Sequence, residues 1–558
     1  MRIAPVALAL LCAAVLFTGL GRIGFVDDRE ARDAEVAREL IQRREVLTPL
    51  YAHEPRFEKP VLAYVPDALG RWLTPGSPLA SRRLRAAAAV ALVLLTASIG
   101  ARHFGARAGW CAAGVLVTSL GLPLAARTDG TQLLGSLLGW VGCAGVADAV
   151  FGRSAGRDLR LVAAYGALGA ALVVAGPLPA LWPFVALALY LRLARSREGW
   201  TAARPLLGLA IIAGFALPWY GAMIERHGLA FIGRAPFFPY GMQPRGAWYS
   251  GVVFALPYLA VAGFPWSALL PGAAMHAATW WRRVPLARLR AEAAGGAAAP
   301  GVAADAPLAG AHPVARERRE ESTAHFFVAC LGAALLPMLV YPGPGVSAAL
   351  PALPAVALLC GRFLDHLFED ADRVRLALAS AAQMLALSGT AMAIGCAALA
   401  PRLPEAAPTL RLLGALVLVT SWAPFLSGLI GRRRMAAALL ALPVAVGAPV
   451  VSLALLPALE DHLNARSVAS ALAVAAPARA PLAVIEPAPP SLRLYARRNL
   501  VVADSLAETL AACRAADGYA YVVFPPSHES RVLHAARDPL EILLRTPGLV
   551  LARVEARR

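Results

Sequence analysis

The chain has 558 residues, 58% of them hydrophobic, with a formal net charge of +18 and a mean hydropathy of +0.60. This apolar content excludes an ordinary soluble domain, and the long apolar runs indicate α-helices that cross a membrane repeatedly. Arginine-rich cytoplasmic loops and anionic lipid account for the positive charge, so membrane lipid and not nucleic acid is the expected partner.

Thirteen apolar stretches are predicted to cross the membrane, within a transmembrane domain of residues 1–460. They cover residues 4–21, 85–101, 109–126, 133–151, 160–176, 178–194, 205–224, 249–273, 323–341, 345–365, 376–399, 410–430 and 435–457. Alternate loops are rich in arginine, which places the N-terminus in the cytoplasm. The loop 22–84, the loop that carries Asp129 and the chain after about residue 458 are then extracytoplasmic.

The loop 22–84 is a charged exception in an otherwise hydrophobic N-terminal half. Asp27 and Glu30 form a capping-box pattern, which predicts a helix that continues to about Gln42. Two roles are open for that helix. It lies in the membrane interface and has no catalytic role, or it brings a carboxylate to an extracytoplasmic cavity. Lys59 is the only lysine in the chain. Its compact charge suits a phosphate, although a single lysine can also remain by chance.

Asp129 follows the third predicted span. An even number of crossings separates it from Asp27 and Asp28, so these carboxylates can converge on one membrane face. Asp129 also suits a simpler role as the cap of the fourth spanning helix. Carboxylates beside a lysine favour a site for a phosphate-linked substrate. A carboxylate there accepts the proton of an attacking hydroxyl, and Lys59 with nearby arginines stabilises the departing phosphate.

Two further regions lie outside the predicted spans. Residues 282–322 are rich in Ala, Gly and Pro and basic at both ends, which predicts a disordered cytoplasmic linker. Residues 480–558 contain four strand-like segments, PLAVIEP, LVVADS, YAYVVFPP and LVLARVE, which alternate with helical segments. This alternation predicts a small extracytoplasmic α/β domain.

The histidines predict no metal site, because they are scattered and no pair has ligand spacing on a helix. No cofactor is firmly implied, and a divalent metal has no support in the sequence.

Several motifs together resemble a known family. They are Glu30–Leu40 (EARDAEVAREL), Leu47-Thr48-Pro49, Phe57-Glu58-Lys59-Pro60, Ala126–Asp129, Trp248-Tyr249 and Pro265-Trp266. Over about residues 20–365 the chain resembles the bacterial GT-C membrane glycosyltransferases of the protein-mannosyltransferase and aminoarabinose-transferase type. The resemblance implies about thirteen spans in the bacterial inner membrane, with extracytoplasmic juxtamembrane helices. It also implies inverting transfer of a sugar from a polyprenyl-phosphate carrier to a lipid, glycan or protein acceptor.

The chain departs from the family pattern at three places. Arg29 stands where the family has the leading acidic residue, Ala175-Gly176-Pro177 lacks the family's lysine, and Ser347–Pro351 lacks a tyrosine. Catalytic carboxylates are therefore expected among four residues, with Asp28 favoured: Asp28, Asp129, Asp27 and Glu30. Donor-phosphate binding is expected from four basic residues: Lys59, Arg32, Arg56 and Arg245.

Two other interpretations of the sequence stay open, a transporter or lipid flippase and a catalytically degenerate family member. Transporters bury charged residues at mid-membrane and carry matched broken helices in two halves. In this chain the acidic residues cluster in loops and the two halves differ, which favours the enzyme.

Overall fold

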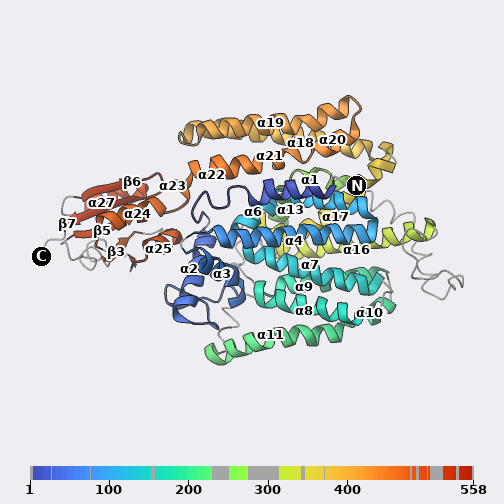
Figure 1. Ribbon diagram of the computed structural model, residues 1–558, viewed down its shortest axis with the longest axis horizontal. Coiled ribbons are helices and arrows are strands. Elements are labelled where there is room, and N and C mark those ends of the chain that lie inside the picture. Colours follow the sequence, from blue (N-terminus) through green and yellow to red (C-terminus); the bar gives the residue numbers. More distant parts are fainter. Residues whose placement is uncertain are drawn as a thin grey trace.

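Long, nearly parallel helices make up the body of the protein in the computed structural model (Figure 1). The structure describes residues 4–26, 28–75, 77–151, 157–194, 197–228, 231, 250–273, 313–340, 346–369, 371–477, 480–485, 489–498, 500–502, 519–535 and 540–555. Within these residues nine helical stretches are long and apolar enough to cross a membrane, or ten if one bent pair is a single span. The predicted class, a multi-pass helical membrane protein, is confirmed.

These stretches correspond to ten of the thirteen predicted spans. They are built from α4 Leu79–Phe104, α5 Ala106–Val117, α6 Gly121–Thr128, α7 Gly130–Phe151, α8 Arg157–Ala175, α9 Pro177–Ala194, α10 Arg197–Ala203, α11 Pro205–His227, η4 Val346–Ala352, α17 Leu353–Glu369, α18 Ala371–Leu399, η5 Ala400–Arg402, α19 Ala407–Leu429, α20 Arg433–Leu439, α21 Leu442–Val450, η6 Val451–Leu455 and α22 Leu456–Ala458.

The other three predicted spans hold helices that are shorter or begin in charged residues. These are α1 Ala4–Cys12 with η1 Ala13–Phe17, α13 Ser250–Ala262, and α16 Pro313–Val340. Because α16 begins at Pro313, the disorder predicted for residues 313–322 is wrong. Residues 282–312 of the predicted linker lie outside the described part of the chain.

The predicted span 109–126 is bent rather than straight. α5 and α6 meet at an angle of 56°. Thr118 Oγ1 at the break accepts a hydrogen bond from Trp266 Nε1 at 2.8 Å, and the Leu120 N–H donates to Phe264 O at 2.9 Å. These bonds satisfy polar groups that a break in a spanning helix would otherwise leave open. The bend leads α6 directly into Asp129, which follows the last residue of the helix.

Small residues let α5 pack closely against α4 and α17. A Cβ atom at Gly109 of α5 would lie 2.5 Å from Ala97 O of α4. A Cβ atom at Gly361 of α17 would lie 2.6 Å from Ala112 N of α5. The backbones therefore approach as closely as glycine allows, which is a common packing mode for helices in membranes.

Replacing Gly109 with alanine is expected to destabilise the protein by about 1–3 kcal/mol, because the new methyl group must push α4 and α5 apart. Gly114→Ala on the same helix is the matched control, since nothing lies within 4 Å of its added Cβ. Alanine has a higher helix propensity than glycine, so the Gly114 variant should be as stable as wild type or more stable by up to about 1 kcal/mol. Thermal unfolding in detergent measures both variants, and equal losses would contradict the close packing.

A compact group of short elements follows the first apolar helix and lies at one end of the bundle (Figure 1). It comprises α2 Asp28–Arg43, β1 Leu50–Tyr51, β2 Glu54–Pro55, η2 Val61–Tyr64 and α3 Val65–Leu73. The helix predicted from the capping box is thus present as α2. Its Val36 and Ala37 pack against Ala63 and Tyr64 of η2, and all four side chains are buried. This packing fixes the orientation of α2 relative to the bundle.

The C-terminal region folds into a five-stranded sheet with the order β4-β3-β5-β7-β6. Its strands and short helices are β3 Leu482–Val484, α25 Pro490–Ala496, β4 Leu500–Val502, β5 Tyr519–Phe524, η7 Pro526–His528, α27 Glu529–Ala535, β6 Leu540–Arg545 and β7 Val550–Glu555. β3 is parallel to β4 and β5, with Ala483 opposite both Val501 and Val522. β7 is antiparallel to β5 and β6.

This sheet differs from the sequence prediction in two ways. Four strands are predicted, and β6 is an additional edge strand whose residues are mostly half-buried or exposed. The core of the sheet also includes α24 Arg466–Ala475, which precedes the predicted start at residue 480 and contributes Val468 and Leu472. The helical segment predicted between β4 and β5 lies outside the described residues.

The sheet domain docks on α2 through α25. Figure 1 shows the sheet, α2 and α3 at the same end of the helical bundle. The Phe25 N–H donates to Tyr495 Oη at 2.9 Å, and the Gly24 N–H donates to Glu460 Oε1 at 3.0 Å. The C-terminal domain therefore holds the segment that leads into α2.

Candidate functional site

Glu30 in the first turn of α2 is the centre of a buried ion network. Its carboxylate is 1% exposed and accepts two hydrogen bonds from Arg82, from Nε at 2.9 Å and from Nη2 at 2.7 Å. Arg85 Nη1 adds a third at 3.0 Å. An ionised carboxylate is stable in a buried position only with such partners. The buried position of Glu30 therefore requires both arginines.

Arg82 and Arg85 also connect the network to other elements. Arg82 donates to three backbone carbonyls of the segment before α2: Leu20, Ile23 and Gly24, at 2.8–3.1 Å. Arg85 donates to Arg127 O at 3.1 Å and pairs with Asp67 of α3. Burial raises the pKa of Asp67; Arg85 opposes this rise, and Asp33 and Glu30 add to it. One network thus joins α2, α3, α4 and α6.

Lys59 lies beside this network and not at an open surface. It is 3% exposed, and its Nζ donates to Asp33 Oδ2 at 2.5 Å. Asp33 comes from the next turn of α2 after Glu30. The only lysine of the chain is therefore held by a carboxylate of the very helix predicted to carry the catalytic residues.

Asp129 meets the N-terminal end of α2, as the count of spans predicts. Its Oδ2 lies 3.5 Å from Arg29 Nη1 and accepts a hydrogen bond from Ser347 Oγ at 2.9 Å. Its Oδ1 accepts from the Gln132 N–H at 3.1 Å, so the capping role predicted for α7 is also present. The side chain is buried, whereas 27% of the Arg29 side chain is exposed. Arg29, at the position of the family's leading acidic residue, thus contacts Asp129 directly.

The remaining predicted residues have different surroundings. Asp28 begins α2, but its side chain, like all of Asp27 and Arg245, lies outside the described residues. Arg32 is half-buried on α2. Arg56 pairs with Glu58, and its guanidinium lies 5.4 Å from the centre of the Tyr51 ring.

Four buried polar atoms, one on Asp33 and three on residues that interact electrostatically with it, have no hydrogen-bond partner within the described part of the chain. They are Asp33 Oδ1, Arg56 Nε, Tyr64 Oη and Arg85 Nε. The pKa of Tyr64 is raised well above its usual range, first by burial and then by Asp33. Unsatisfied buried polar groups are costly and rare, and their concentration at one place is typical of a functional site.

The described His, Cys, Asp and Glu residues contain no group of three or more that could hold a metal ion. The arrangement instead supplies cations beside carboxylates. Such a site can bind a phosphate and accept a proton from a hydroxyl group.

Sequence reasoning missed Arg82, Arg85, Asp67 and Ser347. The pair Arg82 and Arg85 left one signal, an excess of basic residues at the N-terminal end of α4, on the side that the sequence predicts to be extracytoplasmic and where the charge rule expects few. Ser347 left none.

The structure comparison assigns the chain to a fold class. No family model and no curated protein matches the sequence. The fold is that of the GT-C membrane glycosyltransferases, which confirms the fold class predicted from the sequence.

The particular structures it resembles are those of ArnT, an aminoarabinose transferase from Cupriavidus metallidurans. With ArnT bound to undecaprenyl phosphate the TM-score is 0.74 at 16% identity, over 98% of this chain and 97% of that one. With its apo state the TM-score is 0.72 at 16% identity, over 100% and 97%. The Archaeoglobus fulgidus oligosaccharyltransferase matches at a TM-score of 0.45 and 11% identity, over 96% and 70%.

Replacing Arg82 with glutamine is expected to destabilise the protein by about 3–5 kcal/mol, because Glu30 would keep a buried charge with one cation fewer. Arg83→Gln is the matched control, since Arg83 is the exposed neighbour of Arg82 in α4 and should change stability by less than about 0.5 kcal/mol. Thermal unfolding in detergent compares them. An Arg82 variant as stable as the Arg83 variant would contradict the role of the network.

The Leu47-Thr48-Pro49 motif is anchored to the end of α11. Glu45 accepts hydrogen bonds from Arg226 at 2.9 and 3.0 Å and from the Leu47 and Thr48 N–H groups. Thr48 Oγ1 lies 2.9 Å from His227 Nε2. The Arg226 hydrogen bond, followed by the two backbone bonds, lowers the pKa of Glu45 from its ordinary 4.5 to about 2, against an opposing effect of burial.

A lowered pKa means that ionised Glu45 stabilises the fold above pH 4.5 and that this contribution is lost as the pH falls towards 2. Glu45→Gln is therefore expected to reduce stability at pH 7, by no more than about 1 kcal/mol because the pair is partly exposed. Unfolding temperatures of wild type and variant should approach each other as the pH is lowered to about 3. A difference that stays constant or grows on acidification would contradict the ion pair.

Proposed function

We propose that the protein is a glycosyltransferase of the bacterial inner membrane. It transfers a sugar from a polyprenyl-phosphate carrier to an envelope lipid, glycan or protein acceptor, with its site and C-terminal domain on the extracytoplasmic face. One observation carries the proposal. The Lys59–Asp33 and Arg29–Asp129 pairs lie together on a fold that matches ArnT bound to undecaprenyl phosphate over nearly the whole chain.

Donor binding is assigned to the basic side of this site. Lys59 and Arg56 hold the carrier phosphate, with Arg32 and Arg245 as the further predicted contacts. Lys59 is already charge-paired with Asp33, so a phosphate that approaches it either joins or replaces that carboxylate. A phosphate offers stronger, charge-assisted hydrogen bonds to a cation than a neutral ligand does.

Catalysis is assigned to Asp129, together with Asp28, the first residue of α2, and Asp27, which precedes it in the sequence. The carboxylate accepts the proton of the acceptor hydroxyl while the hydroxyl oxygen attacks the anomeric carbon from the side opposite the phosphate. The bond between that carbon and the phosphate oxygen breaks, its electron pair remains on the phosphate, and Lys59 stabilises the added charge. The configuration of the sugar is thereby inverted. Glu30 positions α2, since its described contacts are the ion pairs with Arg82 and Arg85 and a hydrogen bond from the Val26 N–H at 3.4 Å.

Lys59→Ala and Asp129→Asn are expected to separate binding from chemistry. The Lys59 variant should lose both undecaprenyl-phosphate binding and transfer, whereas the Asp129 variant should retain binding and lose transfer by about 100-fold or more. Purified protein in nanodiscs is titrated with undecaprenyl phosphate, and transfer is followed on envelope extracts loaded with labelled carrier-linked sugar. Arg83→Gln removes a positive charge at an exposed position of α4 and is the control for loss of charge.

Normal turnover in either variant would contradict the assigned site. If wild type binds the carrier and moves it across a liposome membrane without forming a glycosidic bond, the protein is a flippase. If it binds the carrier and does neither, the Arg29–Asp129 pair marks a catalytically degenerate member of the fold.

A further inference from the structure

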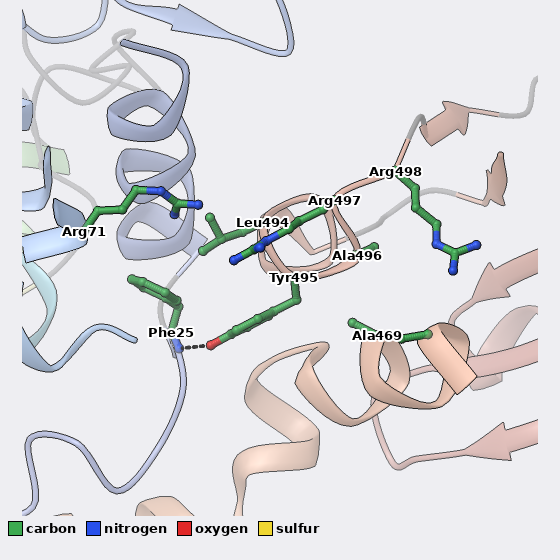
Figure 2. Close-up of a pocket in the computed structure, with 9 residues that line it drawn as sticks. Phe25, Arg71, Ala469, Leu494, Tyr495, Ala496, Arg497 and Arg498 are labelled. Carbon is green, nitrogen blue, oxygen red and sulfur yellow. Dashed lines mark hydrogen bonds between the residues drawn. The ribbon is translucent and has the colours of Figure 1, made fainter. Parts of the chain in front are cut away.

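A cavity lies between α3 and the C-terminal domain. Its volume is about 400 Å³, within the roughly 300–1,000 Å³ that small-molecule pockets occupy. The residues that define its chemistry come from both sides: Phe25, Arg71, Leu494, Tyr495, Arg497 and Arg498 (Figure 2). None of its described lining residues carries a carboxylate.

Two of the three arginines turn into this cavity. Figure 2 shows the guanidinium groups of Arg71 and Arg497 directed towards each other, while Arg498 points away. Arg498 is occupied elsewhere, since it donates to Pro477 O at 2.6 Å and Ala476 O at 3.1 Å beyond the end of α24. Arg71 and Arg497 are thus the cations available to a ligand.

Within the described part of the chain, neither Arg71 nor Arg497 forms an ion pair. Glu35 of α2 attracts Arg71 but is itself held by Arg38, whose Nε donates to it at 2.8 Å. Burial lowers the pKa of Arg71, and the like charges of Arg38 and Arg497 lower it further. Arg71 and Arg497 therefore repel each other in a half-enclosed space.

The walls of the cavity are fixed independently of any ligand. Tyr495 accepts the hydrogen bond from the Phe25 N–H, and the two rings lie 6.0 Å apart between centroids. Leu494 packs with Phe25 in a small core against Ala31 and Ala34 of α2. These contacts fix Leu494 and Tyr495, the residues of α25 that lie just before Arg497 in the chain.

We propose that this cavity binds a phosphate-bearing anion between Arg71 and Arg497. Each guanidinium offers a planar fork of donors that matches phosphate oxygens, and the anion removes the repulsion between the two cations. Because Arg71 belongs to α3 and Arg497 follows α25, the bound anion joins the juxtamembrane helices to the C-terminal domain. The site is separate from the Lys59 site and does not depend on glycosyl transfer.

The test uses the full-length protein in detergent, with thermal unfolding followed during a titration with inorganic phosphate at constant ionic strength. Wild type is expected to show a saturable rise in unfolding temperature. Arg71→Gln and Arg497→Gln should each require about tenfold more phosphate, because each removes a charge-assisted contact, and the double variant should not respond. Arg411→Gln, on the exposed side of α19, should respond like wild type.

A second experiment distinguishes the two possible sources of the phosphate group, a lipid headgroup and a soluble ligand. Nanodiscs of phosphatidylcholine are compared with nanodiscs that contain phosphatidylglycerol, in phosphate-free buffer. Stabilisation by phosphatidylglycerol that the double variant abolishes identifies a lipid headgroup, and a response to inorganic phosphate alone identifies a soluble ligand; both support the site.

A purely structural role predicts other results. If Arg71 stabilised the fold by itself, Arg71→Gln would be less stable than wild type without phosphate, whereas relief of repulsion leaves it at least as stable. Loss of stability in phosphate-free buffer, an unresponsive wild type in both experiments, or a double variant that responds like wild type would overturn the proposal.

Discussion

The pairing of Glu30 with Arg82 and Arg85 is the constraint on which the site depends. It places the first turn of α2 against the beginning of α4, and through Asp67 and Arg127 O it fixes α3 and the end of α6. Asp33 and Arg29 flank Glu30 on α2, so fixing Glu30 also fixes the partners of Lys59 and Asp129. A charge network of this kind is weak evidence for stability but strong evidence for a defined geometry, because removing any member leaves a buried charge.

The network also explains why the loop 22–84 is so basic. In the proposed orientation the loop is extracytoplasmic, on a face where the charge rule expects few arginines. Arg82, Arg85 and Lys59 are all turned inward onto carboxylates. These charges belong to the folded loop and not to the membrane surface. Arg71 lies outside this network and faces Arg497 across the cavity between α3 and the C-terminal domain, which has no carboxylate among its described lining residues. This makes that cavity a candidate for binding.

Much of this arrangement could be predicted from sequence, and the limits have physical causes. Hydrophobic runs determine spanning helices, the capping box determines α2, and counting spans brings Asp129 to the N-terminal end of α2. Which polar side chains pair with each other is decided by tertiary contacts. No local sequence pattern indicates that Lys59 bonds to Asp33 or that Ser347 bonds to Asp129. The bend between α5 and α6 had a signal in Gly121 and Pro123, but the continuous apolar run concealed it. β6 is an edge strand without a clear alternating pattern.

The central claim is that this site transfers a sugar to an envelope acceptor. Mass spectrometry of glycolipids and glycoproteins from cells with and without the gene tests it most directly. One acceptor is expected to lose a sugar when the gene is deleted and to regain it with the wild-type protein but not with Asp129→Asn. Identical glycan profiles in both strains, or full restoration by the Asp129 variant, would contradict it.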